Sequence, residues 1–127
     1  MSRRKRLVLM SCVATMTAGM LTQETSAQPF IVRNGEPRAQ IVVAKRPTRM
    51  QTLAAEQLRT YIRKISGAEL PIVMTEVDTY PVKIYVGRSA YTDELGLRNT
   101  DLDFGAYRVK SGEDYLVLMG RDSDYFM

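Results

Sequence analysis

Carboxylates gather in the second half of the chain, in segments that carry turn residues. They are Asp93, Glu94, Asp101, Asp103, Glu113, Asp114, Asp122 and Asp124. Two carboxylates at a suitable separation can hydrolyse a glycosidic bond, and an Asp-x-Asp pair can supply oxygen ligands to calcium. Neither Asp-x-Asp pair, Asp101–Asp103 or Asp122–Asp124, continues into a full calcium-binding loop. We therefore expect mainly solvated turn and cap residues, with a cation site and a catalytic pair as the alternatives.

Tyrosine is the main aromatic residue, with seven copies and no tryptophan. An amphipathic ring of this kind can pack in a core or present a face to a ligand. Most of the tyrosines fall on apolar stretches, where core or rim packing is expected. Tyr80 and Tyr91 fall in predicted loops. They are therefore the candidate carbohydrate contacts.

One short segment has the residue types of an anion site. Gly87-Arg88-Ser89 follows a predicted strand and precedes a predicted short helix or turn. Backbone N–H groups at such a junction can bind an anion, and Arg88 would add positive charge. A single glycine is also the ordinary end of a strand. A simple turn is therefore the favoured interpretation.

The first 27 residues have the pattern of an export signal. Four cations, Arg3 to Arg6, precede an uncharged stretch from Leu7 to Leu21, and Thr25-Ser26-Ala27 supplies small residues for cleavage. The apolar stretch is shorter than the roughly 20 residues of a spanning helix. Alternatives are a lipoprotein signal with Cys12 as the lipid acceptor, a twin-arginine signal beginning at Ser2, and a disordered tail. We expect export to the periplasm or the extracellular space, without a stable membrane anchor.

Removal of this segment changes the chemistry that the chain offers. The whole chain carries 18 − 14 = +4 charges and the signal carries 4 − 1 = +3, so residues 28–127 carry 14 − 13 = +1. A nearly balanced domain gives no support to nucleic-acid binding. Cys12 is the only cysteine, and the chain has no histidine. Cys/His zinc sites, Ser-His-Asp triads and cysteine nucleophiles are therefore excluded, and we predict no catalytic, cofactor-binding or metal-binding residue.

The elements that must position these residues are those of one α+β domain over residues 28–127. Short β-branched runs predict strands at 30–32 and 41–44, joined as a hairpin around Asn34-Gly35. Further strands are predicted at 70–74 and 82–86, and a hairpin at 106–110 and 115–119. The 115–119 strand is apolar throughout, which suggests an interior position.

A long amphipathic helix is the clearest element and is predicted from Thr48 to Ser66. Thr48 and Gln51 form a capping-box pair, and Gly67 supplies a C-terminal stop. Its apolar positions recur at helical spacing. They are Met50, Leu53, Ala54, Leu58, Tyr61, Ile62 and Ile65. We predict a mixed sheet of about five to six strands with this helix on one face, and nothing of comparable size for the other face.

The pattern over residues 40–124 resembles a known module. Ala54-Ala55-Glu56-Gln57-Leu58 and Ile65-Ser66-Gly67-Ala68-Glu69-Leu70-Pro71-Ile72 are similar to the N-terminal α+β domain of bacterial α-glucuronidases and the related domain of β-N-acetylhexosaminidases. Ile84-Tyr85-Val86-Gly87, Gly105-Ala106-Tyr107-Arg108-Val109 and the run from Tyr115 to Asp122 extend the likeness. The resemblance depends on the order and spacing of these segments.

The resemblance implies a non-catalytic accessory domain of an exported carbohydrate-active enzyme. Its partner would be a glycoside hydrolase barrel, whose acid and nucleophile or base carboxylates have no counterpart here. In the family a helix leading to the barrel follows at about residue 123, so the resemblance also implies a fragment, a truncated reading frame or a stand-alone remnant. Alternatives are a stand-alone carbohydrate-binding or surface interaction module, and a small enzyme that uses only carboxylates.

Overall fold

The computed structural model describes residues 29–121, so the predicted export signal and Asp122 to Met127 lie outside the described residues. The fold is α+β, with a five-stranded mixed sheet, a long helix and a short helix. In chain order the elements are β1 (Val32–Arg33), β2 (Glu36–Pro37), β3 (Ala39–Val42), α1 (Arg49–Ser66), β4 (Ile72–Val73), β5 (Val82–Val86), α2 (Ala90–Glu94), β6 (Tyr107–Ser111) and β7 (Tyr115–Gly120).

The main sheet has the strand order β4-β3-β5-β7-β6. The first four strands are parallel, and only β6 runs antiparallel, as the partner of β7. The predicted β6–β7 hairpin is confirmed. β7 pairs on both sides, in agreement with its apolar sequence. The 70–74 strand is shorter than predicted, because only Ile72 and Val73 pair with β3.

The N-terminal hairpin differs from the prediction. Asn34 and Gly35 both have positive φ, at 53° and 78°, so they form a tight turn that pairs β1 with β2. The 41–44 run does not join this hairpin. β3 begins at Ala39 and pairs instead with β4 and β5 in the main sheet. The turn at Asn34-Gly35 was predicted correctly. Because it contains only two residues, the strands that pair across it are the residues directly on either side.

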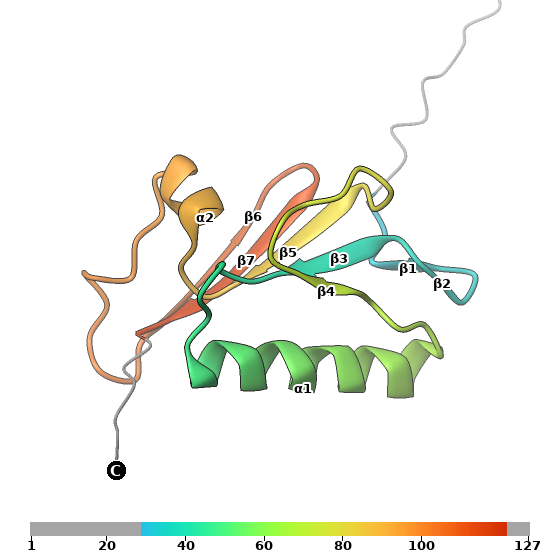
Figure 1. Cartoon of the computed structure of the whole chain (residues 1–127), viewed down its shortest axis with the longest axis horizontal. Helices are drawn as coiled ribbons and strands as arrows, with labels where there is room; N and C mark the ends of the chain where they lie inside the picture. Colours follow the sequence, from blue (N-terminus) through green and yellow to red (C-terminus); the bar gives the residue numbers. More distant parts are fainter. Residues whose placement is uncertain (1–28, 122–127) are drawn as a thin grey trace, which may run out of the picture.

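Helix α1 begins and ends as predicted. The Thr48 hydroxyl accepts the Gln51 N–H at 3.1 Å, the Gln51 side chain accepts the Thr48 N–H at 3.2 Å, and Gly67 closes the helix at φ 77°. Ala55 is fully buried, and Leu58 and Ile62 pack on the same core as Ile41, Ile84 and Leu70. Figure 1 shows α1 lying along one side of the sheet.

The predicted apolar stripe of α1 is wider than the face that it buries. Met50, Leu53, Tyr61 and Ile65 are exposed by 51, 49, 58 and 85%. The line that faces the sheet passes through the buried Gln51 and Ala55 and the half-buried Leu58 and Ile62, at spacings of four, three and four residues. The exposed residues lie beside this line, where the sheet does not reach.

The other face of the sheet is better covered than predicted. Val42, Tyr85, Val117 and Met119 form a second core with Leu97 from the segment after α2. Figure 1 shows α2 on the side of the sheet opposite α1. The 74–81 loop is fixed by the fully buried Gln40. The Gln40 amide donates to the carbonyls of Val77 and Tyr80 at 2.7 and 3.1 Å and accepts the Val77 N–H at 3.0 Å. Helix α2 and the loops beside it therefore cover this face in place of a second long helix.

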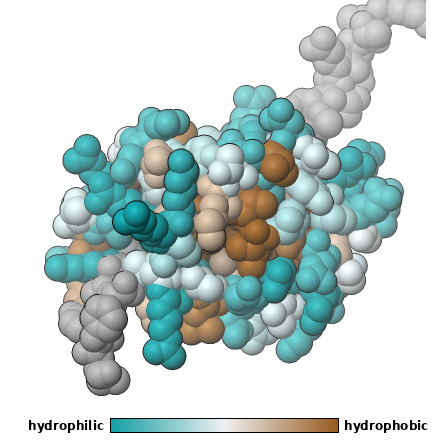
Figure 2. All heavy atoms as spheres, in the orientation of Figure 1, coloured by the Kyte–Doolittle hydropathy of each residue, from teal (hydrophilic) through white to brown (hydrophobic). Residues whose placement is uncertain are grey.

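The edge at β4 carries a patch of apolar surface. Figure 2 shows hydrophobic side chains gathered in the middle of the drawn face, where Figure 1 places β4. Ile72 and Val73 are half-buried there, and Met74 is 52% exposed. Because only two residues of β4 pair with β3, this edge offers little backbone for strand addition. Within residues 29–121, no helix has the length and hydropathy needed to cross a membrane.

Candidate functional site

The two predicted carbohydrate contacts lie in different surroundings. Tyr91 belongs to α2 rather than to a loop, and its ring stacks on Tyr85 with the centroids 5.8 Å apart. Its hydroxyl accepts the Glu76 N–H at 3.2 Å. Tyr80 precedes β5, is half-buried, and uses its carbonyl to bind Gln40. One face of the Tyr91 ring is therefore covered by Tyr85. The Tyr80 carbonyl is used to hold the 74–81 loop.

Tyr85 is the centre of this aromatic cluster. It is 7% exposed, donates its hydroxyl hydrogen to Glu76 and lies 6.3 Å from the Tyr115 ring, centroid to centroid. Burial, and then the Glu76 carboxylate, raise the pKa of the phenol well above its usual range. The phenol therefore stays protonated at physiological pH. It anchors the 74–81 loop to the sheet.

Three of the clustered carboxylates form ion pairs. Asp93 pairs with Arg88, Asp101 with Arg108, and Asp114 with Lys83, at shortest distances of 2.9, 2.7 and 2.7 Å. In each case the hydrogen bond from the cation holds the pKa of the carboxyl below its ordinary value. Such groups are ionised at neutral pH and do not act as general acids.

The described residues do not gather the carboxylates into a metal site. Within residues 29–121, no group of three or more His, Cys, Asp or Glu side chains is placed to hold a metal ion. Asp101 is engaged with Arg108, and the Asp122–Asp124 pair lies outside the described residues.

An apolar groove of about 260 Å³ lies between α1 and the β6–β7 hairpin. Met50, Ala54 and Leu58 line one wall, and Tyr107, Val109 and Leu118 line the other. Tyr107 and Val109 are 78 and 57% exposed, although they point to the face of the sheet that α1 covers elsewhere. Helix α1 approaches β4 and β5, on either side of β3, so β6 is left open on this face and Leu116 and Leu118 of β7 are only half-buried. Sequence reasoning missed the groove, although the excess width of the α1 stripe was its signal.

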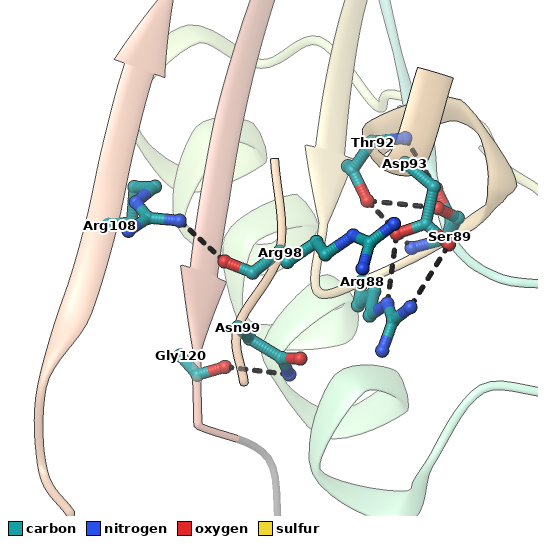
Figure 3. A network of polar contacts seen from close by, with 8 residues as sticks. All are labelled: Arg88, Ser89, Thr92, Asp93, Arg98, Asn99, Arg108 and Gly120. Atoms are coloured by element: carbon teal, nitrogen blue, oxygen red, sulfur yellow. Dashed lines mark hydrogen bonds and ion pairs between the residues drawn. The ribbon is translucent and has the colours of Figure 1, made fainter. Parts of the chain in front are cut away.

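A polar crevice of about 440 Å³ lies at the carboxyl ends of the parallel strands β3 and β5. Arg46 and Thr48 come from the segment after β3, Arg88 and Ser89 from the segment after β5, and Asn99 from the loop after α2. Figure 3 shows the side chains that hold the β5 side of this crevice. The Arg88 guanidinium binds both oxygens of Asp93, at 2.9 and 3.3 Å. Asn99 donates to the Gly120 carbonyl at 3.3 Å.

Two residues of the Gly87-Arg88-Ser89 segment, Arg88 and Ser89, line this crevice, whereas Gly87 lines the apolar groove. Gly87 has φ 76°, and a Cβ on it would lie 2.4 Å from the Gln51 side-chain nitrogen. The glycine is therefore needed for its backbone angle and for its close approach to α1. Ser89 caps α2 by a reciprocal pair of hydrogen bonds with Thr92. Arg46, which sequence reasoning did not single out, completes the lining from the other strand.

Comparisons with protein-family models, with curated proteins and with solved structures returned no match for this chain.

Proposed function

We propose that this chain is the non-catalytic accessory domain of an exported carbohydrate-active enzyme, and that it packs against an α-glucuronidase-like glycoside hydrolase barrel. The observation that carries the proposal is the apolar groove between α1 and β6–β7. Exposed apolar area that is concentrated rather than scattered marks an interaction surface. Met50 from the helix, with Tyr107 and Val109 from the edge strand, provides such an area.

The state of the carboxylates supports the non-catalytic part of the proposal. A glycosidase needs one carboxyl group with a raised pKa beside a second, ionised one. Asp93, Asp101 and Asp114 have lowered pKa values and are paired with cations. Tyr85 also stays neutral. In the described part of the chain these carboxylates and Tyr85 make contacts within the domain. We assign the hydrolytic chemistry to the partner barrel.

An activity assay tests the non-catalytic assignment. The purified chain is incubated with glucuronoxylan and with an aryl N-acetylhexosaminide, and released sugar is measured against a blank. We expect no release above the blank. Release that follows the amount of this chain and survives repeated purification would overturn the assignment and favour the small carboxylate enzyme.

A binding assay separates the accessory domain from a stand-alone carbohydrate-binding module. Affinity electrophoresis in glucuronoxylan is run with the chain, with Tyr80→Ala and with Tyr91→Ala. Tyr107→Ala is the control, because Tyr107 is an exposed tyrosine on the groove. The proposal expects no retardation of any variant. Retardation that Tyr80→Ala or Tyr91→Ala abolishes and Tyr107→Ala preserves would favour the carbohydrate-binding module.

A further inference from the structure

The polar crevice at the ends of β3 and β5 occupies a special position in the sheet. The two strands are neighbours and parallel. From β3 the chain passes through α1 to β4 on one side, whereas from β5 it passes through α2 toward β6 and β7 on the other. The connections therefore separate just beyond the carboxyl ends of these strands. In open sheets with parallel strands, such a separation leaves a crevice in which ligands bind.

The floor of the crevice is polar and buried. Ser89 is 7% exposed and Gln51 is 5% exposed. The Ser89 oxygen accepts the Thr92 N–H at 3.4 Å. Within residues 29–121, no hydrogen bond is donated by the Ser89 hydroxyl group. Gln51 is held by the α1 capping box, which fixes the floor in place before any ligand arrives.

The charge around the crevice is positive and incompletely balanced. Arg46 and Arg88 line it together with a single acid, Asp93, which is already bound to Arg88. Arg46 has no ion-pair partner among the described residues. In Figure 3 the side chain of Arg98 also extends toward Arg88 and Asp93, and its charge contributes to the lowered pKa of Asp93.

Helix α1 adds to this positive potential. The first turn of α1 contains no acidic residue and begins with Arg49, against the usual preference for acids at the positive end of a helix. The cation at this position costs stability in the unliganded chain. A bound anion would offset that cost.

From these features we propose that the crevice binds a small oxyanion, either a sugar carboxylate or a phosphate. Arg46 would supply the charge, and the Ser89 hydroxyl and the Asn99 amide would supply hydrogen bonds to oxygen. The crevice opens at the end of the sheet and is lined by different residues from the apolar groove, apart from the shared Gln51. The proposal therefore stands independently of the accessory-domain function.

Calorimetric titration tests the proposal. The full chain is titrated with sodium D-glucuronate, with inorganic phosphate and with neutral D-glucose at low ionic strength. We expect saturable binding of at least one anion and none of glucose, and the preferred anion identifies the source of the oxyanion. Absence of anion binding, or equal binding of glucose, would overturn the proposal.

Two variants decide whether the bound anion lies in the crevice. Arg46→Gln should weaken anion binding by about tenfold or more, because a hydrogen bond to a charged group is lost. Arg46 has no partner among the described residues, so this change leaves the fold intact. Arg33→Gln, an exposed cation of β1 at the opposite end of the sheet, should leave the affinity unchanged. Equal effects of the two substitutions would show non-specific charge attraction and contradict the proposal.

Discussion

At the scale of single residues, the chain uses its polar groups mainly to fix backbone segments. Gln40 binds the 74–81 loop, Gln51 caps α1, and Gly87 allows β5 to pass close to that cap. Three of the carboxylates that first suggested catalysis, Asp93, Asp101 and Asp114, are bound to arginine or lysine. Residue types alone could not reveal this, because the partners of Asp101 and Asp114 lie 7 and 31 positions away in the chain.

Gly87→Ala should destabilise the domain more than Gly96→Ala. Both glycines have positive φ, at 76° and 71°, so each substitution carries a backbone cost of about 1–2 kcal/mol. Only the Gly87 methyl group would collide with Gln51, whereas nothing lies within 4 Å at Gly96. Urea unfolding of both variants measures the difference in free energy of unfolding. Equal losses would show that the contact with Gln51 is unimportant.

The Lys83–Asp114 pair should make a small, pH-dependent contribution to stability. The pKa of Asp114 is lower in the folded chain, so its contribution is present above an unfolded pKa of about 3.9 and is lost as the pH falls through the folded value. Because Asp114 is largely exposed, we expect Asp114→Asn to lower the free energy of unfolding at pH 6 by less than about 1 kcal/mol.

This difference between wild type and Asp114→Asn should shrink as the pH falls from 6 to 2, because the carboxyl group becomes protonated in both states. Urea unfolding at the two pH values measures it. Asp103→Asn is the control, because Asp103 has no ion pair among the described residues. A gap that persists unchanged at low pH would contradict the linkage.

At the scale of elements, local signals predicted α1 and the β6–β7 hairpin well. The Thr48–Gln51 capping box and Gly67 define the ends of α1, and the polar 111–114 segment defines the hairpin. The parallel strand order was beyond prediction, because β3, β5 and β7 meet through contacts that no local pattern encodes. The N-terminal hairpin was predicted with the wrong partner because its two-residue turn pairs the residues that directly flank it, whereas β3 joins the main sheet.

The two apolar lines of α1 should respond differently to substitution. Leu58→Asp places a charge against the core cluster and should cost at least about 3 kcal/mol, which is enough to unfold a marginal domain. Leu53→Asp changes a residue that is 49% exposed and should leave the helix folded. Far-UV circular dichroism during thermal unfolding distinguishes them. Equal destabilisation would show that Leu53 contributes to the core as much as Leu58 does.

At the scale of the whole molecule, the sheet is covered unevenly. Helix α1 covers β3 and β5, and the α2 region covers the opposite face, but β6 lies open beside α1 and β7 is only partly covered. The proposed partner barrel would complete this core. Among the exposed apolar residues of α1, Met50 faces this groove together with Tyr107 and Val109 of β6.

The most direct test of this account is calorimetric titration of the chain with a separately purified α-glucuronidase catalytic barrel. Val109→Asp and Lys110→Asp place the same new side chain at neighbouring positions of β6, but only Val109 lines the groove. We expect saturable one-to-one binding, weakened at least about tenfold by Val109→Asp and little affected by Lys110→Asp. Absence of binding, or an equal loss in both variants, would contradict the assignment of the groove as the docking surface of an accessory domain.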